Sequence, residues 1–262
     1  MFKPKQSLGQ NFLIDANIAR KIVKTARINS EDEVWEIGSG KGILTKALLD
    51  KTSNIICFEI DNYLAEYLQQ RLKVNVINSD ILKVDWQNFF HKKKIKIVAN
   101  IPYHITSPLL FKILKFKDYF SQIVLMIQKE VAERLTAGPG TKNYSALSVK
   151  IQSFFRIYYE FRVKSHLFYP KPKVDSAVIR MLPKHNDMQN RKAYLDFVKQ
   201  CFSMRRKTLR NNLKPLFAKQ KLAELVSITE TNLQRRAETL TIQEFKNLYK
   251  DFQKISFDYF SK

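Results

Sequence analysis

Short apolar segments alternate with amphipathic, helix-length stretches through the first half of the chain, and this alternation restricts the possible folds most. The apolar segments, each rich in β-branched residues, are 34–37, 55–58, 74–77, 95–99 and 123–127. A helix-like stretch from Pro108 to about Leu114 precedes the last of them. Short buried strands that alternate with helices are typical of a parallel sheet. The sequence therefore predicts an α/β fold here.

The second half of the chain has a different pattern. Two strand-like runs, 156–163 and 174–181, are joined by a proline-rich loop without a helix, which predicts an antiparallel hairpin at the end of the sheet. After Pro183 the strands stop, and helical periodicity runs through 194–203, 207–217 and 245–252. Thr241 and Glu244 have the spacing of a capping box. We expect a first domain over 1–183, a linker over 184–190 and a small all-helical domain over 191–262.

The charge balance points to a polyanionic partner. Lys and Arg number 46 against 24 Asp and Glu, a net charge of +22 spread over the whole chain. This distribution favours contact with many phosphates of a large nucleic acid, with simple solubility as the other interpretation. The two cysteines and four histidines lack the spacing of a metal site or a disulfide scaffold. Without a long apolar run or a secretory signal, we expect no membrane association and a cytoplasmic location.

A glycine-rich loop follows the first predicted strand. Gly38, Gly40 and Gly42 suit backbone that turns tightly and approaches a ligand closely. Ile43 stands where the dinucleotide-binding fingerprint requires its third glycine, which argues against a nicotinamide cofactor. The pattern favours S-adenosylmethionine (SAM), which has no pyrophosphate.

Two acidic residues follow the next two strands. Glu59, at the end of the second strand, can accept hydrogen bonds from both ribose hydroxyls, and Asp80, after the third strand, can accept from the adenine amino group. The alternative is that the glycines only form a turn and the acids only cap helices.

The fourth strand ends in the run Asn100-Ile101-Pro102-Tyr103. The exocyclic amine of adenine is a poor nucleophile because its lone pair is delocalised into the ring, so an enzyme that alkylates it must offer acceptors to the N–H bonds. The Asn100 side-chain oxygen and a carbonyl of Ile101 or Pro102 are candidate acceptors. Tyr103 can stack on an extruded base. An ordinary strand-to-loop turn is the alternative interpretation.

These motifs together resemble the KsgA/RsmA family of small-subunit rRNA adenine N6,N6-dimethyltransferases. The resemblance runs from about Lys5 to Phe252. It is carried by Ser7–Asp15, Glu36–Gly42, Asn100–Tyr103, Lys173–Val178 and Phe202–Arg210. It implies a Rossmann-like class I methyltransferase domain followed by a small helical domain, with SAM as the methyl donor and no metal. It also implies dimethylation of two adjacent adenosines in a hairpin near the 3′ end of that rRNA, during ribosome biogenesis.

The resemblance also assigns residues. It implies SAM contacts at Asn11, Leu13, Gly38, Glu59, Asp80 and Asn100, and we add Gly40 from the glycine loop. Phe168, before the proline-rich loop, matches the family's second aromatic residue near the target base, although an aromatic residue in this position is more commonly part of a core. Ser145 stands where the family usually has glycine.

Basic residues near the start of a helix in the second domain are candidates for rRNA contact. They are Arg205, Arg206, Lys207 and Arg210. Positions 206 and 210 would be one helical turn apart and face the same way. The functional interpretation is phosphate contact, and the alternative is a solvated helix surface.

Two other functions remain open from the sequence. An Erm-type enzyme acting on large-subunit rRNA shares the run 100–103, but the opening at 8–13 and the basic residues 205–210 argue against it. A non-catalytic rRNA-binding assembly factor on the same fold is the other candidate, and the intact glycines with Glu59, Asp80 and Asn100 argue against that. We expect the partner to be small-subunit rRNA or a precursor of the small subunit, and the protein to be a monomer.

Overall fold

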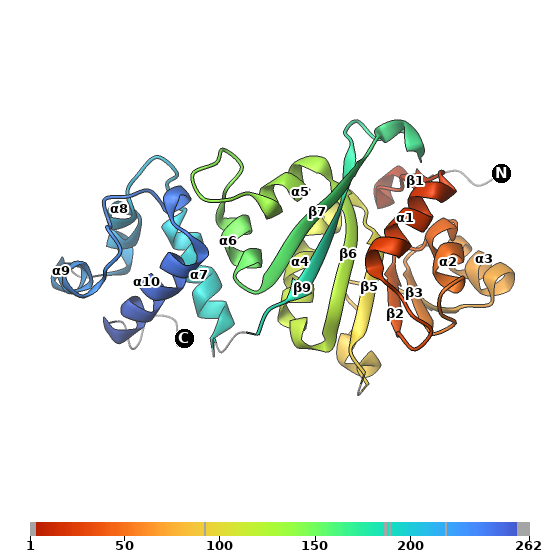
Figure 1. Cartoon of the computed structure of the whole chain (residues 1–262), viewed down its shortest axis with the longest axis horizontal. Coiled ribbons are helices and arrows are strands. Elements are labelled where there is room, and N and C mark those ends of the chain that lie inside the picture. Colours follow the sequence, from red (N-terminus) through yellow and green to blue (C-terminus); the bar gives the residue numbers. More distant parts are fainter. Residues whose placement is uncertain (1–3, 92, 186–187, 189, 218, 256–262) are drawn as a thin grey trace. The chain divides into compact units, whose positions relative to one another are not determined.

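The computed structural model of the protein describes residues 4–91, 93–185, 188, 190–217 and 219–255 (Figure 1). The chain forms two compact units. The first, here the α/β unit, comprises Met1–Ala132 and Phe155–Pro183, and the second, here the helical unit, comprises Glu133–Phe154 and Lys184–Lys262. The predicted boundary over 184–190 stays a prediction. Residues 186, 187 and 189 of that segment, and 256–262 of the predicted second domain, lie outside the described residues.

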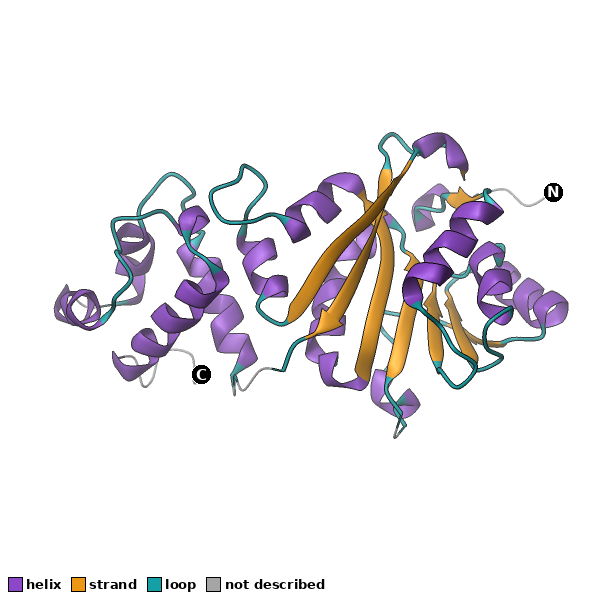
Figure 2. Cartoon of the chain, in the orientation of Figure 1, coloured by secondary structure: helices purple, strands orange, loops and turns teal. Residues whose placement is uncertain are grey.

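A seven-stranded sheet forms the centre of the α/β unit, as far as the described residues show, in the order β4-β3-β2-β5-β6-β9-β7 (Figure 2). The strands are β2 (Val34–Ile37), β3 (Ile55–Glu59), β4 (Asn75–Asn78), β5 (Ile95–Asn100), β6 (Phe120–Gln128), β7 (Phe155–Val163) and β9 (Ser176–Pro183). Strands β2 to β6 are parallel, and β9 pairs antiparallel with both β6 and β7. The predicted α/β fold with a terminal antiparallel hairpin is confirmed.

A second, two-stranded sheet was not predicted. It pairs β1 (Phe12–Leu13) with β8 (Phe168–Tyr169), so that Leu13 lies opposite Phe168. Strands of two residues have no periodicity that a sequence can reveal. This small sheet holds the N-terminal segment against the chain that leads into β9.

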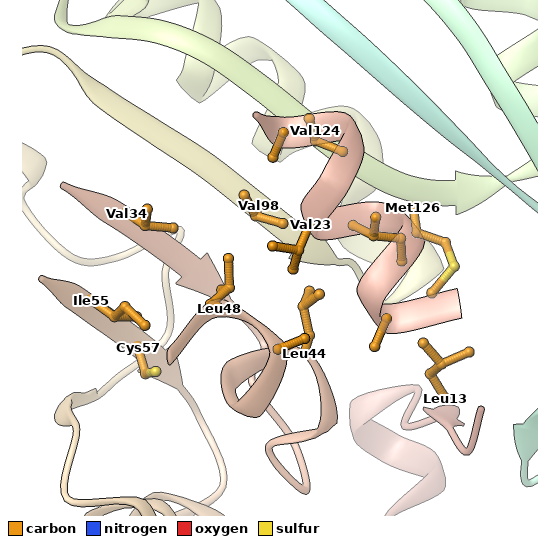
Figure 3. Packing of buried hydrophobic residues seen from close by; sticks show 14 of the residues in the cluster. Leu13, Val23, Val34, Leu44, Leu48, Ile55, Cys57, Val98, Val124 and Met126 are labelled. Atoms are coloured by element: carbon orange, nitrogen blue, oxygen red, sulfur yellow. The ribbon is translucent and has the colours of Figure 1, made fainter. Parts of the chain in front are cut away.

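Helices cover the sheet of the α/β unit. They are α1 (Ala16–Ala26), α2 (Ile43–Leu49), α3 (Asn62–Leu72) and α4 (Thr106–Lys115), with 3-10 turns η1 (Gln6–Leu8), η2 (Trp86–Phe89), η3 (Tyr103–Ile105), η4 (Lys117–Tyr119) and η5 (Ser165–Leu167). On one face of the sheet, Val34, Val98 and Val124 pack with Val23 of α1 and Leu48 of α2 in one apolar cluster (Figure 3).

The opposite face of the sheet is built on aromatic rings. Trp35 follows Val34 and therefore points the other way. Its ring lies edge-on to Trp86 at 5.6 Å and stacks on Phe90 at 5.5 Å between centroids. Trp86 also packs edge-on against Phe120 of β6. Because both faces are covered, strands β2, β3, β5 and β6 are mostly buried and their ends are held in fixed positions, whereas the edge strand β4 is partly exposed.

The described part of the helical unit consists of α-helices and 3-10 turns. Its elements are α6 (Ala146–Gln152), α7 (Arg191–Cys201), α8 (Leu209–Leu213), η6 (Lys214–Leu216), α9 (Lys219–Ile228), η7 (Ala237–Thr239) and α10 (Ile242–Ile255); α5 (Lys129–Thr136) begins in the α/β unit and ends here. The predicted capping box is present, because the Thr241 hydroxyl accepts from the Glu244 N–H and Glu244 accepts from the Thr241 N–H. Ser145 is the N-cap of α6. Within the described residues, every helix is too short or too polar to span a lipid bilayer.

Candidate active site

A cavity lies at the carboxyl ends of β2, β3, β4 and β5 in the α/β unit, with an empty volume of about 1170 Å³ including its open mouth. Its lining contains every residue that the sequence predicted for cofactor and base. These are Asn11, Leu13, Gly38, Gly40, Glu59, Asp80, Asn100, Ile101, Pro102, Tyr103 and Phe168. Carboxyl ends of parallel strands at the centre of an open α/β sheet are the usual ligand position in such folds. The individual roles of these residues stay predictions.

The glycine loop has a backbone that only glycine adopts without strain. Gly38 has φ +72° and Gly40 has φ +56°. A Cβ atom on Gly40 would lie 3.0 Å from the ring of Phe12, and one on Gly38 would lie 3.6 Å from the Asn100 carbonyl oxygen. The loop therefore passes close to the N-terminal segment at Gly40, where a side chain would crowd the Phe12 ring, and close to the end of β5 at Gly38.

Glu59 and Asp80 each organise their own surroundings. Glu59 is 5% exposed and accepts hydrogen bonds from the N–H of Gly40 at 2.8 Å and of Asp61 at 3.0 Å. Burial raises the pKa of Glu59, and these two hydrogen bonds oppose the rise. Asp80 accepts from the Leu82 N–H at 2.9 Å. Both carboxylates thus support local turns, but neither is the N-cap of a described helix, which is the role that the alternative interpretation gave them. Each carboxylate still has acceptor positions for a ligand, because two oxygens offer about four lone pairs.

A buried acid, Glu36, also borders the cavity, and no role was predicted for it from the sequence. It is 1% exposed and accepts from the Thr45 hydroxyl at 2.6 Å. Burial raises the pKa of Glu36 to about 8, so that this carboxyl is largely protonated at neutral pH. An uncharged acid beneath the glycine loop avoids repulsion of the buried Glu59.

The Asn100 side chain is oriented by the N-terminal segment. Its amide Nδ2 donates to the carbonyl oxygen of Asn11 at 3.4 Å. Because the amide nitrogen takes this acceptor, Oδ1 is the atom left to accept hydrogen bonds. The Ile101 N–H donates to Met126 of the neighbouring strand, and the Pro102 carbonyl accepts from the Ile105 N–H. The Ile101 carbonyl is therefore the better candidate for a second acceptor.

Two aromatic residues line the same cavity. The Tyr103 hydroxyl lies 2.8 Å from the Ser176 hydroxyl at the start of β9, which restricts the ring. Burial raises the pKa of Tyr103, so its hydroxyl is neutral at physiological pH. Phe168 is 3% exposed and belongs to the apolar cluster as well as to the cavity wall. The Phe168 side chain therefore packs in the core and also contacts the cavity.

The N-terminal segment covers one side of the cavity, and Asp61 is one of the residues that hold it there. The carboxylate of Asp61, itself 1% exposed, accepts from Gln10 at 3.1 Å and pairs with Lys5 at 3.0 Å. The same carboxylate caps α3 through the Tyr63 N–H. These contacts could not be predicted from the sequence, because Gln10 and Lys5 lie more than 50 positions from Asp61.

Several further residues of the cavity wall had no predicted role. They include Phe12, Lys41, Ile60 and His104. Phe12 and Lys41 lie inside motifs already identified, directly next to predicted site residues. Their place beside those residues is the signal by which the sequence could have identified them. Ile60 is 46% exposed directly after Glu59, an exposed apolar side chain at a strand end.

The basic residues of the helical unit are exposed, but their predicted arrangement is wrong in part. Arg205, Arg206 and Lys207 lie in a turn, and α8 begins only at Leu209, after the N-cap Thr208. Arg206 and Arg210 therefore do not share a helix. Arg205 donates to Glu238 and to the Lys142 carbonyl. The three side chains at 206, 207 and 210 remain candidates for phosphate contact.

The family model described as ribosomal RNA adenine dimethylase matches residues 1–254 of this chain. The chain is 43% identical over 247 residues to the ribosomal RNA small subunit methyltransferase A of Prosthecochloris aestuarii, covering 94% of this chain and 92% of that protein. It is 45% identical over 226 residues to the protein of that name from Malacoplasma penetrans, covering 86% of this chain and 83% of the relative.

Two solved structures have a similar fold. A dimethyladenosine transferase from Plasmodium falciparum superposes with a TM-score of 0.85 and 30% identity, covering 95% of this chain and all of that one. The 23S rRNA methyltransferase ErmE superposes with a TM-score of 0.71 at 24% identity, covering 92% of this chain and 99% of the other. The second likeness concerns the fold alone.

Proposed function

Because the chain belongs to the ribosomal RNA adenine dimethylase family, we propose that it is a SAM-dependent enzyme that dimethylates N6 of two adjacent adenosines near the 3′ end of small-subunit rRNA, in a hairpin of the assembling small subunit. One observation carries the proposal for this chain. A single cavity is lined by the glycine loop, two acids at strand ends, the Asn100–Tyr103 turn and Phe168.

The residues of the cavity fit a nucleoside sulfonium ligand. Gly38 and Gly40 expose backbone in place of side chains, Glu59 offers acceptors to ribose hydroxyls, and Asp80 offers one to the adenine amino group. SAM, when bound, supplies an activated methyl group on sulfur, and the protein contributes mainly position. Asn11 and Leu13 complete the wall on the side of the N-terminal segment.

Asn100 is the residue that we propose acts on the target amine. Its Oδ1 and the Ile101 carbonyl oxygen each accept a hydrogen bond from an N6–H group. These hydrogen bonds localise the lone pair of N6 as the bond to the methyl carbon forms. Pro102 fixes the backbone of this turn. Tyr103 and Phe168 hold the extruded base between two rings, and the released N6 proton passes to water.

Partner and location are proposed on the same basis. The charge of +22 supports contact with many rRNA phosphates, for which Arg206, Lys207 and Arg210 are the candidates on the helical unit, with Arg205 held by local bonds. We propose a cytoplasmic location because the substrate class lies there in bacteria. The monomeric state stays a prediction that light scattering would test.

Mass spectrometry of rRNA tests the proposal. Unmodified small and large subunits are incubated with the protein and SAM, and the rRNA of each is digested and sequenced by mass. We expect two adjacent dimethyladenosines in the small-subunit rRNA and none in the large-subunit rRNA. Modification of large-subunit rRNA alone would establish the Erm-type alternative, and binding without methyl transfer would establish an assembly factor.

A further inference from the structure

A lysine outside the predicted site binds three carbonyl groups at once. The ammonium of Lys112, on α4, donates to the carbonyl oxygens of Ile81, Leu82 and Val84 at 2.8, 2.9 and 2.6 Å. An ammonium has three protons, and all three are used. Charge-assisted hydrogen bonds of this kind are about twice as strong as neutral ones.

These carbonyls belong to the turn that carries Asp80. The Asp80 carboxylate accepts from the Leu82 N–H, and the Asp80 carbonyl accepts from the N–H groups of Lys83 and Val84. Three N–H groups of the turn therefore bond to Asp80, and three of its carbonyl groups bond to Lys112. Asp80 and Ile81 both line the cavity. Without Lys112, these N–H groups of the turn would keep their partners, but three carbonyl groups would lose the ammonium donor that they share.

Lys112 is itself held in place. Its ammonium lies 5.0 Å from the ring centroid of Trp86, and the Trp86 indole N–H donates to the Ile81 carbonyl at 3.1 Å. Burial lowers the pKa of Lys112, and the charges of Asp80 and Asp85 oppose this effect. A partly buried cation with three backbone partners has a specific position, unlike a solvated surface lysine.

The helix that carries Lys112 starts at the other wall of the site. Helix α4 begins at Thr106, directly after the turn η3 with Tyr103, and its residues Leu109 and Ile113 are fully buried under the sheet. Six residues of helix, about 9 Å, separate Thr106 from Lys112. One rigid element thus joins the turn after β5 to the turn after β4.

We propose that Lys112 is a positioning residue for the cofactor: it fixes the turn that carries Asp80 to helix α4, and thereby sets the adenine-recognising carboxylate relative to Asn100. The proposal rests on the proposed function, in which Asp80 accepts from the adenine amino group. Lys112 touches neither ligand nor reacting atoms in this role. Its effect is on the preference of the cofactor site for adenine over a base that lacks the amino group.

The test measures ligand binding by calorimetry with the full chain. The probes are S-adenosylhomocysteine and S-inosylhomocysteine, in which oxygen replaces the adenine amino group. The variants are Lys112→Met, which keeps the apolar stem and removes the donors, and Lys112→Arg, which keeps several donors. Lys115→Met is the matched control, since Lys115 is exposed on the same helix. Asp80→Ala and the double variant with Lys112→Met complete the set.

We expect Lys112→Met to weaken binding of S-adenosylhomocysteine about tenfold and to reduce the preference over the inosyl ligand to a similar degree. Lys112→Arg should restore most of this preference, and Lys115→Met should stay within twofold of the parent chain. The double variant should bind no worse than Asp80→Ala alone, because Lys112 acts through Asp80.

Other outcomes overturn the inference in distinguishable ways. Unchanged preference in Lys112→Met together with lost preference in Asp80→Ala would remove Lys112 from the site while leaving the proposed function intact. Losses that multiply in the double variant would mean that Lys112 acts independently of Asp80. If Asp80→Ala itself kept the full preference, the adenine contact in the proposed function would fail, and the role of Lys112 with it. Should Lys112→Met not fold, Lys112→Gln takes its place, because an amide offers at most two donors to the three carbonyls; a reduced preference for the adenosyl ligand supports the inference, and an unchanged preference overturns it.

Discussion

The hydroxyl groups of Tyr103 and Ser176 lie 2.8 Å apart and join the turn after β5 to the first residue of β9. The two residues are 73 positions apart in the chain. Ser176 is fully buried, so its side chain is held by the sheet. The ring that we propose stacks on the target base is thereby anchored to the antiparallel part of the sheet.

Tyr103→Phe should lower the rate of methyl transfer about fivefold, because one hydrogen bond worth about 1 kcal/mol is lost while the ring remains. Ser176→Ala should give the same loss. Tyr103→Ala removes the stacking surface and should cost about 100-fold. Single-turnover methylation of small subunits measures all three. Equal losses in Tyr103→Phe and Tyr103→Ala would show that the ring does not stack.

Asn100→Ala should reduce turnover by a factor on the order of 10² to 10³, since an acceptor for the target amine is removed. SAM affinity should fall only moderately, because Glu59 and Asp80 remain. Calorimetry and single-turnover rates separate the two effects. The control Asn247→Ala removes an exposed amide of α10 and should change neither. Near-parental turnover in Asn100→Ala would remove its assigned role.

Gly40→Ala should abolish detectable SAM binding and lower Tm by several degrees. The added methyl group meets the Phe12 ring at 3.0 Å, and the positive φ costs a further ~1–2 kcal/mol. Gly138→Ala is the matched control, because no atom lies within 4 Å of its Cβ position. Thermal scans with and without SAM measure both. Normal binding in Gly40→Ala would place the ligand elsewhere.

Glu36→Gln should become more stable relative to the parent chain as pH rises from 5 to 8. The pKa of Glu36 is raised from 4.5 to about 8, so its stabilising contribution is complete below pH 4.5 and is lost as pH rises through the folded pKa. The glutamine variant keeps an acceptor for Thr45 and has no proton to lose. The difference in Tm across this pH range measures the effect, and a constant difference would contradict a raised pKa.

Arg206→Ala should reduce the slope of log K against log salt for binding to small-subunit rRNA by about 1, the contribution of one phosphate contact, with Tm unchanged. Arg205→Ala should instead lower Tm, because Arg205 holds Glu238 and the Lys142 carbonyl. Filter binding at several salt concentrations and thermal scans distinguish the two arginines. An unchanged slope in Arg206→Ala would assign Arg206 to the solvated surface.

The parallel strands and the glycine loop could be predicted because their signals are local. An apolar run such as 95–99 identifies a buried strand by itself, and the acids follow directly on strand ends. The sheet order places those ends together, so the cavity follows once the strands are known. The position of β9 between β6 and β7 has no such signal, since both neighbours offer apolar partners.

The parts that could not be predicted depend on long-range contacts or short local choices. Lys112 binds carbonyls about 30 positions away, and nothing in its own neighbourhood distinguishes it from Lys115, the other lysine of α4. The predicted helix at Arg206 fails for a local reason. Thr208 caps α8 with its side chain, and Arg205 is drawn to Glu238, so the basic run stays in a turn.

The carboxylate of Asp61 has a consequence for how this protein can change over evolution. It caps α3 and also fastens the segment that covers the cavity. A substitution of Asp61 that weakens the hold on this segment would speed the exchange of demethylated cofactor for SAM. The same substitution would remove the N-cap of α3, a helix that flanks the sheet. Ligand exchange and fold stability are therefore linked through one side chain, and neither property can be adjusted there without altering the other.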